Sequence, residues 1–338
     1  MELVKVLQDG FWESTSVVRD AQGCLFVRKQ STAAGADSPW GHQALREEIR
    51  FLGSVPDAAK IYYPPLVDHW DDPVNGKVGY CIPYYADYEN VSIAVRNESL
   101  SQSEADEIQR HLSTAIIEAT HVPAPPCGIV QHIRETIEDA ILRLRKLPDF
   151  ASCIDTREIE INGSVMPGLG RAYALARDSA AMKMLDSLPT VRLHGDLILE
   201  NILWSATGTP PLRLIDPVSV AGIASGPAAF DLVKYASYAS GELYALRSGA
   251  IQTRPASEGS NAFIYHPPEL PAFTRIDLLS GFARAFEQRH GPPNPAVDRL
   301  LDGYFSLVMA VNTSGQQQWG RIIKGILSLN TAVETLVT

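Results

Sequence analysis

The chain has few cysteines and no long apolar run. Its 338 residues contain four cysteines, Cys24, Cys81, Cys127 and Cys153, and no pair has a Cys-x-x-Cys spacing. This number and spacing argue against a disulfide scaffold and indicate reduced thiols. No segment approaches the roughly 18 apolar residues of a membrane-spanning helix. Charges interrupt the first ten residues, which argues against a signal peptide. We therefore expect a cytoplasmic protein with no membrane partner.

The chain also has no excess of basic residues. It contains 29 Lys and Arg against 39 Asp and Glu, which gives a formal net charge of −10. Sequence-independent binding of nucleic acid needs a basic surface, so we expect no nucleic-acid partner. An acidic chain is compatible with a cationic small molecule, although acidity also serves solubility alone.

Several common active-site motifs are missing. There is no Walker A sequence, and Gly168-Leu169-Gly170 lacks the third small residue of a dinucleotide-binding fingerprint. The segment from Gly222 to Gly226 does not have the G-x-S-x-G spacing of a hydrolase nucleophile elbow. We find no internal repeat and no low-complexity tract. These absences argue against a P-loop protein, a dinucleotide-dependent enzyme and a serine hydrolase.

The pattern of apolar residues divides the chain into a strand-rich part and a helical part. It predicts strands at residues 4–7, 16–19, 24–29, 62–70 and 78–83 and a helix at 40–52. Beyond residue 87 it predicts helices at 103–121, 132–147, 171–188, 230–248, 275–290, 295–311 and 320–337. We therefore expect an α+β chain with a small N-terminal lobe, residues 1–86, and a larger, mainly helical lobe, residues 87–338.

One segment spaces polar side chains as phosphoryl transfer requires. His194 to Trp204 reads H-G-D-L-I-L-E-N-I-L-W, and L-I-D-P follows at 214–217. Two short predicted strands, joined by a turn rich in Gly, Pro, Ser and Thr, bring Asp216 back toward Asp196 and Asn201. Because this reaction depends mainly on positioning and charge neutralisation, the pattern predicts one carboxylate at the acceptor hydroxyl. An amide and a second carboxylate would bind Mg²⁺.

H-G-D-x-x-x-x-N followed by I-D resembles the aminoglycoside phosphotransferase and choline kinase-like group, whose members are relatives of protein kinases. The I-D-P form, with F-D-L-V-K at Phe230 to Lys234, is similar to the streptomycin and hydroxyurea kinase types and to some sugar kinases. The resemblance implies a bilobal protein-kinase-like fold. Its N-terminal lobe would be a small antiparallel sheet with one helix that binds nucleotide, and its C-terminal lobe would carry catalysis and the acceptor.

The resemblance also implies roles in the catalytic loop. Asp196 is the expected catalytic base, and Asn201 and Asp216 are the expected Mg²⁺ ligands. His194 is expected to brace the loop, with a metal-binding His-x-Asp pair as the alternative. Asp231 is expected to hydrogen-bond the loop backbone. Its alternative role is that of a carboxylate favoured by the dipole at a helix N-terminus.

In the N-terminal lobe, the resemblance points to a cation and its acidic partner. Lys29 ends Phe26-Val27-Arg28-Lys29 and is expected to pair the α- and β-phosphates, with Arg28 as the alternative. Neighbouring residues of a strand point to opposite faces, so only one of the two can do this. Glu48, on the following helix, is the expected partner of the lysine, with Glu47 as the alternative.

Two further segments are expected to bind the nucleotide. Gly10, Ser14 and Thr15 lie in a predicted phosphate loop, for which an ordinary turn is the alternative. Pro83 and Tyr85 lie where the resemblance places the hinge, so the Pro83 carbonyl and the Tyr85 N–H are expected to meet adenine. A plain edge strand is the alternative there.

These features together predict an ATP-dependent O-phosphotransferase that uses Mg²⁺, with GTP as the other candidate nucleotide. The acceptor would be a hydroxyl of a small molecule, such as an aminoglycoside or nucleoside-type antibiotic. A metabolic sugar, choline-like or homoserine-like substrate is the alternative, and a non-catalytic pseudokinase is the distant one. We expect the acceptor pocket near Ser219 to Ser225, Glu242 and the final helices. The oligomeric state is expected to be a monomer or a homodimer.

Overall fold

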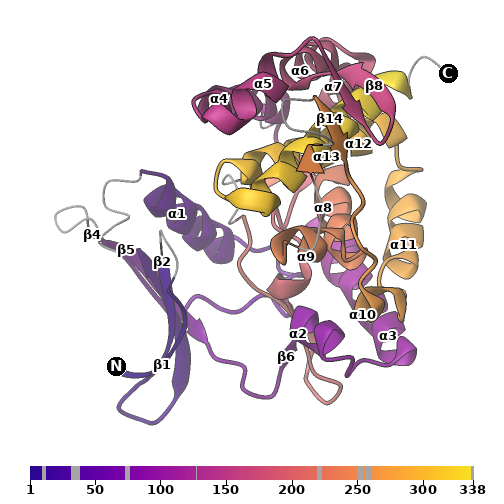
Figure 1. Cartoon of the computed structure of the whole chain (residues 1–338). Helices are drawn as coiled ribbons and strands as arrows, with labels where there is room; N and C mark the ends of the chain where they lie inside the picture. The colour runs from indigo at the N-terminus through magenta and orange to yellow at the C-terminus, as the bar shows by residue number, and fades with distance from the viewer. Residues whose placement is uncertain are drawn as a thin grey trace. The chain divides into compact units, whose positions relative to one another are not determined.

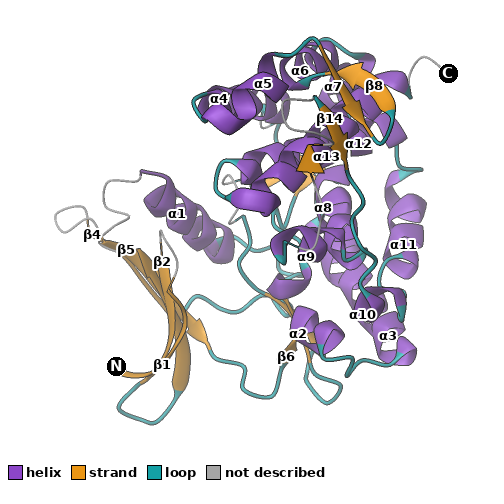
Figure 2. Ribbon diagram, in the orientation of Figure 1, coloured by secondary structure: helices purple, strands orange, loops and turns teal. Residues whose placement is uncertain are grey.

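A computed structural model shows two compact units, each built from two stretches of the chain (Figures 1 and 2). Unit 1 comprises Met1–Ala124 and Val191–Gly226, and unit 2 comprises Pro125–Thr190 and Pro227–Thr338. The structure describes residues 1–9, 13–31, 39–72, 77–126, 128–218, 223–249, 254–255 and 261–335. The segment with the H-G-D motif thus groups with the N-terminal strands, and the predicted lobe boundary after residue 86 stays a prediction.

Unit 1 begins with a five-stranded antiparallel sheet in the order β1-β2-β3-β5-β4. Its strands are β1 (Glu2–Asp9), β2 (Glu13–Arg19), β3 (Leu25–Ser31), β4 (Asp68–Asp72) and β5 (Lys77–Pro83). The predicted strand at 62–70 is wrong over residues 62–67, which contain Pro64-Pro65 and form turns and irregular backbone. Proline has no N–H to give to a sheet.

The helix α1 (Pro39–Gly53) contacts β3 and β5. Leu45, Glu48 and Phe51 recur at three-residue intervals and are all buried, as expected for the inward face of an amphipathic helix. Two of these side chains are apolar and supply packing. The third is a carboxylate, and the same periodicity that buries its neighbours brings it toward the sheet.

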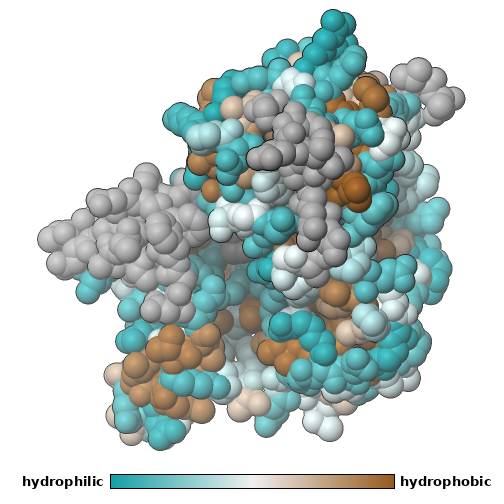
Figure 3. Space-filling model, in the orientation of Figure 1, coloured by the Kyte–Doolittle hydropathy of each residue, from teal (hydrophilic) through white to brown (hydrophobic). Residues whose placement is uncertain are grey.

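The edge strand β1 exposes apolar side chains. Leu3, Val4, Val6 and Leu7 are each more than 40% exposed, and Figure 3 shows hydrophobic atoms gathered at the lower left, where Figure 1 places the N-terminal strand. Such edges favour pairing with another chain, but the expectation of a monomer or homodimer stays a prediction.

The rest of unit 1 consists of short elements, several of which belong to the segment with the H-G-D motif. They are β6 (Glu89–Asn90), α2 (Val91–Arg96), α3 (Gln102–Ser113), the π-helix η2 (Thr114–Thr120), β9 (Thr190–Arg192), the 3₁₀ turn η3 (Leu199–Asn201), β10 (Ile202–Trp204), β11 (Leu212–Leu214) and β12 (Ser225–Pro227). A three-stranded sheet has the order β11-β10-β6, and β9 pairs with β12. The predicted hairpin is therefore present as β10 and β11.

Unit 2 is mainly helical. Its helices are α4 (Ile129–Arg145), α5 (Pro148–Asp155), α6 (Leu169–Arg177), α7 (Ala180–Ser187), α8 (Ala229–Ala239), α9 (Glu242–Arg247), α10 (Pro271–Thr274), α11 (Ser280–His290), α12 (Pro295–Ala310) and α13 (Gly315–Glu334). Two helices predicted as continuous are interrupted. The predicted helix at 171–188 breaks between α6 and α7, and the one at 230–248 breaks at Gly241. The φ of Gly241 is +80°, a conformation that favours glycine.

A small sheet in unit 2 was not predicted from the sequence. Its order is β13-β14-β7-β8, and it contains β7 (Glu158–Ile161), β8 (Ser164–Pro167), β13 (Arg254–Pro255) and β14 (Ala262–Ile264). These strands have two to four residues, too few for apolar alternation to show. None of the described helices combines the length and apolarity that crossing a membrane requires.

The core of unit 2 depends on close contact between α12 and α13. A Cβ built on Gly325 would lie 2.7 Å from Leu307 Cδ2, and one built on Gly303 would lie 3.0 Å from Leu329 Cδ2. The two glycines therefore let the helices approach where larger residues would hold them apart. The edge-to-face pair of Phe230 with Phe305 then links α8 to α12, with ring centroids 4.7 Å apart.

Candidate active site

Asp196 and Asn201 are held together in unit 1. The side-chain N–H₂ group of Asn201 donates to the Asp196 carboxylate at 3.1 Å and to the Asp196 backbone carbonyl at 2.9 Å. Both residues are 5% exposed. Because the amide nitrogen is engaged here, the amide oxygen of Asn201 is the atom left to face a cation. The turn η3 sets this geometry by bringing Asn201 back over Asp196.

Gly195 and His194 shape the backbone that presents Asp196. Gly195 has a φ of +82°, and a Cβ at this position would lie 2.2 Å from the Ile223 carbonyl oxygen. Glycine is therefore required on both conformational and steric grounds. His194 is fully buried, and its Nδ1 accepts the backbone N–H of Asp196 at 3.3 Å. The imidazole also stacks on Tyr63, with ring centroids 6.0 Å apart.

This geometry fits His194 as a brace for the loop. Both this role and the alternative, a histidine that binds metal, stay predictions.

The hairpin β10–β11 delivers Asp216. Ile202 pairs with Leu214, and the Ile215 N–H donates to the Asn201 carbonyl at 3.0 Å. Asp216 follows directly, with a φ of +51°, an uncommon conformation for a residue other than glycine that often marks functional sites. Its carboxylate and the Asn201 amide oxygen are the hard oxygen donors that Mg²⁺ prefers. The residues present therefore fit the predicted metal site.

The Lys29 ammonium contacts three carboxylates that come from separate elements. Its Nζ lies 3.0 Å from Glu48 on α1, 3.1 Å from Glu13 on β2 and 3.4 Å from Asp216 after β11. Lys29 is 3% exposed and Glu48 is fully buried. The structure thus brings the predicted lysine, its predicted partner and one predicted metal ligand into one cluster.

The two alternatives for the lysine pair do not reach this cluster. The Arg28 Nε is buried and has no hydrogen-bond partner among the described residues. Glu47 pairs with Arg50 on the helix surface instead. The strand alternation that separates Arg28 from Lys29 therefore selects Lys29, and the helical period selects Glu48.

Tyr80 completes the buried pair, and sequence reasoning did not find it. Its hydroxyl donates to Glu48 Oε2 at 2.6 Å, and it lies opposite Lys29 in the β3–β5 register. Glu13 was also missed. The register pairs Thr15 with Lys29, and Glu13 is two residues from Thr15 on the same strand face. Finding Tyr80 and Glu13 requires the strand bounds and the strand register, and neither can be read from local sequence patterns.

Burial and the neighbouring charges together shift the pKa values of Lys29, Glu48 and Tyr80. Burial by itself lowers the pKa of Lys29, but Asp216 and Glu48 raise that pKa well above its ordinary value, so the ammonium stays charged. Burial raises the pKa of Glu48, and the Lys29 ammonium opposes that rise. Burial and then Glu48 raise the pKa of Tyr80 well above its usual range, which keeps Tyr80 a hydrogen-bond donor.

The predicted phosphate loop is only partly described. Gly10 lies outside the described residues. Ser14 and Thr15 were expected in the loop but lie within β2, where Ser14 pairs with Asp9 on β1 and Thr15 pairs with Lys29 on β3. Their loop placement was wrong because β2 begins at Glu13 rather than Ser16. Their contact with phosphate stays a prediction.

The predicted hinge residues lie at the end of β5. Pro83 is the last residue of that strand and pairs with Phe26, so its missing N–H coincides with the end of the sheet. The Tyr84 N–H donates to the Leu25 carbonyl at 3.1 Å. The Tyr85 ring lies 4.3 Å beneath the Arg213 guanidinium. Recognition of adenine by Pro83 and Tyr85 stays a prediction.

Two predicted residues lie in unit 2. Asp231 is in the first turn of α8 and is fully buried, a position in which the helix dipole favours a carboxylate. Its hydrogen bond to the catalytic loop stays a prediction. Glu242 begins α9, pairs with Lys324 and accepts a hydrogen bond from Tyr265. Of the other residues expected near the acceptor, 219–222 lie outside the described residues.

Comparisons with known proteins show the fold. No protein-family model matches the sequence, and no curated protein matches it significantly. A candidate fructosamine-3-kinase from Thermobifida fusca is 14% identical with a TM-score of 0.56, over 98% of this chain and 94% of that one. The macrolide 2′-phosphotransferase MphH from Brachybacterium faecium is 12% identical with a TM-score of 0.43, over 98% and 91%. The amicoumacin kinase hAmiN is 10% identical with a TM-score of 0.43, over 97% and 88%.

The last two TM-scores are too low to indicate a shared fold. Because all three identities are low, the similarity concerns the fold and not the activity or the substrate. The first likeness, together with the five-stranded antiparallel sheet and the many helices, shows that the chain has the α+β, protein-kinase-like fold that its motifs predict.

Proposed function

We propose that this chain is an ATP-dependent O-phosphotransferase that transfers the γ-phosphate to a hydroxyl group of a small molecule. One observation carries the proposal. Lys29, Glu48 and Asp216 form a single charged cluster, and the hairpin that delivers Asp216 directly follows Asn201, which holds Asp196. Phosphoryl transfer needs a phosphate-binding cation, metal-binding oxygens and a positioned base, and unit 1 contains all three.

The proposed roles follow from chemistry and burial. Asp196 accepts the proton of the acceptor hydroxyl as that oxygen forms its bond to the γ-phosphorus, while the bond from phosphorus to the ADP oxygen breaks. Asn201 holds the Asp196 carboxylate in place. Mg²⁺, when bound by the Asn201 amide oxygen and Asp216, supplies charge neutralisation for the phosphates. Lys29 binds phosphate oxygens in exchange for one or more of its carboxylate contacts.

The acceptor is proposed as a small molecule, either an antibiotic or a metabolite such as a sugar, a choline-like amine or a homoserine-like alcohol. A sugar amine belongs among the compounds tested because a protein of the same fold is described as a candidate fructosamine-3-kinase. A non-catalytic pseudokinase remains the competing proposal. The presence of Asp196, Asn201, Asp216 and Lys29 in one unit favours catalysis, because a pseudokinase has no need to keep all four.

The experiment is a screen for phosphorylated product. Purified protein would be incubated with Mg²⁺ and either ATP or GTP across aminoglycosides, nucleosides, sugars, sugar amines and amino alcohols, with detection by mass spectrometry. The proposal expects one acceptor class to gain a single phosphate. Asp196→Asn should abolish that gain, whereas Asp186→Asn, an exposed aspartate on α7, should not. Nucleotide binding without any phosphorylated acceptor would favour the pseudokinase.

A further inference from the structure

The Lys29 ammonium is surrounded by more carboxylates than a single cation neutralises. Its Nζ lies 3.0 Å from Glu48, 3.1 Å from Glu13 and 3.4 Å from Asp216, and an ammonium has only three N–H donors. Burial raises the pKa of Glu48 most, Lys29 lowers it, and the charges of Asp216 and Glu13 raise it further. The carboxylates therefore repel one another, and a phosphate oxygen can reach a donor of Lys29 only when one of them leaves.

Glu48 is the carboxylate that stays on Lys29. It is fully buried, and each of its oxygens lies 3.0 Å from Lys29 Nζ. Tyr80 also donates to Glu48 Oε2 at 2.6 Å. A buried carboxylate that lost its cation would be left as an uncompensated charge, which is strongly unfavourable. Asp216 is the carboxylate proposed to bind Mg²⁺, so it has another partner when the metal and nucleotide are present.

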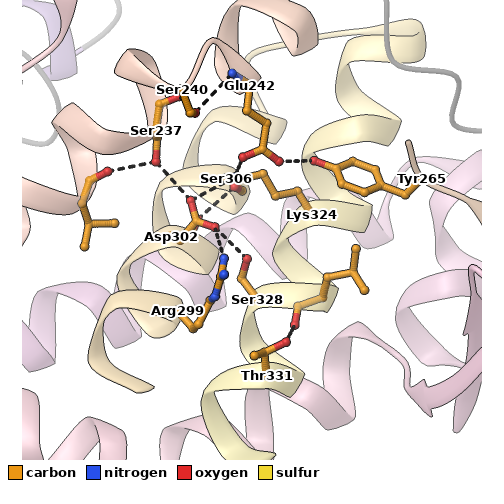
Figure 4. Close-up of polar contacts among 12 residues, drawn as sticks. Ser237, Ser240, Glu242, Tyr265, Arg299, Asp302, Ser306, Lys324, Ser328 and Thr331 are labelled. Carbon is orange, nitrogen blue, oxygen red and sulfur yellow. Dashed lines mark hydrogen bonds and ion pairs between the residues drawn. The ribbon is translucent and has the colours of Figure 1, made fainter. Parts of the chain in front are cut away.

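A second buried lysine shows how carboxylates with a structural role are held (Figure 4). Lys324 in unit 2 pairs with Glu242 and with Asp302 Oδ1, the latter at 3.1 Å. Each of these carboxylates also has a hydroxyl donor. Tyr265 donates to Glu242 at 2.7 Å, and Ser328 donates to Asp302 at 2.9 Å. The additional hydrogen bonds hold each carboxylate in place independently of the lysine, as Tyr80 does for Glu48.

Glu13 has no such additional donor. Among the described residues, Lys29 is the only partner of its side chain, which is 25% exposed. Glu13 is the first residue of β2 and lies two residues from Thr15, which is opposite Lys29. A carboxylate that can reach water regains its hydration when it leaves its partner. Of the three carboxylates on Lys29, Glu13 is therefore the one that leaves at the least cost.

We propose that Glu13 competes with the nucleotide triphosphate for Lys29, so that ATP binds more weakly than it would if Glu13 were uncharged. A phosphate oxygen takes the place of the Glu13 carboxylate, Glu48 stays, and Asp216 turns to Mg²⁺. Because ADP also carries phosphates, the same competition favours its release after transfer. The inference rests on the proposed phosphotransferase function and deepens it, since it names a residue that sets the affinity for the triphosphate.

The test measures nucleotide binding without an acceptor. Titration calorimetry with Mg²⁺ would compare ATP, ADP and adenosine on the full chain and on Glu13→Gln, which keeps the side-chain length and removes the charge. Glu13→Gln should bind ATP about tenfold more tightly, which corresponds to about 1.4 kcal/mol. It should also bind ADP more tightly, and it should bind adenosine with unchanged affinity, because adenosine has no phosphate.

A matched control removes the same charge elsewhere. Glu2 is exposed and pairs with Arg19 at the far end of β1 and β2 from Glu13. Glu2→Gln should change the affinity for none of the three ligands, because exposed charges separated by more than about 10 Å are largely screened by salt. An equal gain in ATP affinity in Glu2→Gln would overturn the proposal, since the gain would then reflect net charge alone.

A double variant tests whether the effect acts through Lys29. In a Lys29→Gln background, Glu13→Gln should no longer tighten ATP binding, because the cation for which the two anions compete is gone. Circular dichroism would confirm folding, and if the Lys29 variant does not fold, the contrast between ATP and adenosine decides alone. Equal or weaker ATP binding by Glu13→Gln, or an equal gain for adenosine, would overturn this proposal alone. No ATP binding by either protein would contradict the proposed function, and this inference with it.

Discussion

Tyr80 donates its hydroxyl hydrogen to Glu48 at 2.6 Å from the position directly opposite Lys29 in the β3–β5 ladder. Lys29 Nζ approaches both oxygens of the same carboxylate, each at 3.0 Å. Glu48 is therefore fixed from two sides in a place where water does not reach it. The orientation of Lys29, and with it the proposed phosphate contact, depends on this buried arrangement.

Removing the Tyr80 hydroxyl should loosen the cluster without removing a charge. Tyr80→Phe leaves Glu48 with one donor fewer, so we expect a loss of stability of about 1–2 kcal/mol. It should also weaken ATP binding modestly, because Lys29 is held less firmly. Chemical denaturation and titration calorimetry would measure the two effects. Tyr84→Phe, at a half-buried tyrosine whose hydroxyl accepts from Lys5 Nζ outside the cluster, is the control, and an equal effect there would count against a specific role for Tyr80.

Replacing Lys29 should have a larger effect. Lys29→Ala leaves Glu48 buried without its cation, which costs about 3–5 kcal/mol in comparable sites. It should also raise the dissociation constant for ATP strongly, because the cation proposed to bind phosphate is lost. Calorimetric titration on protein shown by circular dichroism to be folded would measure this. Arg28→Ala is the matched control on the opposite strand face. If Arg28→Ala alone weakened ATP binding, the choice of Lys29 would be wrong.

Gly195 should tolerate no side chain. Gly195→Ala places a Cβ 2.2 Å from the Ile223 carbonyl oxygen at a φ of +82°. The backbone strain alone costs about 1–2 kcal/mol, and the loop must also move, so we expect lower stability and a severe loss of activity. Gly53→Ala, where a Cβ meets nothing within 4 Å, should behave like the parent protein. Thermal unfolding and the acceptor assay would show both results.

Burial raises the pKa of Asp298, on the first turn of α12, and this gives stability a specific pH dependence. The pKa is about 6 in the folded chain against 3.8 ordinarily, so the folded state binds this proton more tightly than the unfolded state. Below pH 4 both states are protonated and Asp298 has no effect. As the pH rises from about 4 to 6, wild-type stability should fall by about 1–3 kcal/mol relative to Asp298→Asn. Urea unfolding of both proteins across that range would test this, and parallel curves would contradict it.

Local sequence patterns were sufficient to predict the hairpin of the catalytic segment but not the choice of the lysine. The hairpin that joins Asn201 to Asp216 was predictable because turn-forming residues separate two short apolar runs. The choice of Lys29 over Arg28 was open from the residues alone, and only the family resemblance favoured it. Alternation along β3 separates the two side chains, but which of them meets Glu48 depends on how α1 packs on the sheet, which local patterns do not encode.

Features that depend on residues distant in sequence were not predictable. Tyr80 and Glu13 join the Lys29 cluster through strand register, which pairs residues across three strands. The four-stranded sheet of unit 2 joins Glu160 to Ala262 in parallel, a separation that no local pattern encodes. A cavity in unit 2, lined by residues of α8, α9, α11, α12 and α13, likewise joins five helices or their ends. None of these helices identifies the cavity on its own.

The most direct test of the account is phosphorus NMR of the wild-type protein and of Asp196→Asn with Mg²⁺, ATP and the acceptor found in the screen. The wild type should convert the γ-phosphate signal into that of a phosphomonoester on the acceptor. Asp196→Asn should bind ATP with near wild-type affinity but form the product about 10²–10⁴ times more slowly, as expected for a lost general base. Undiminished product formation by Asp196→Asn would contradict the account.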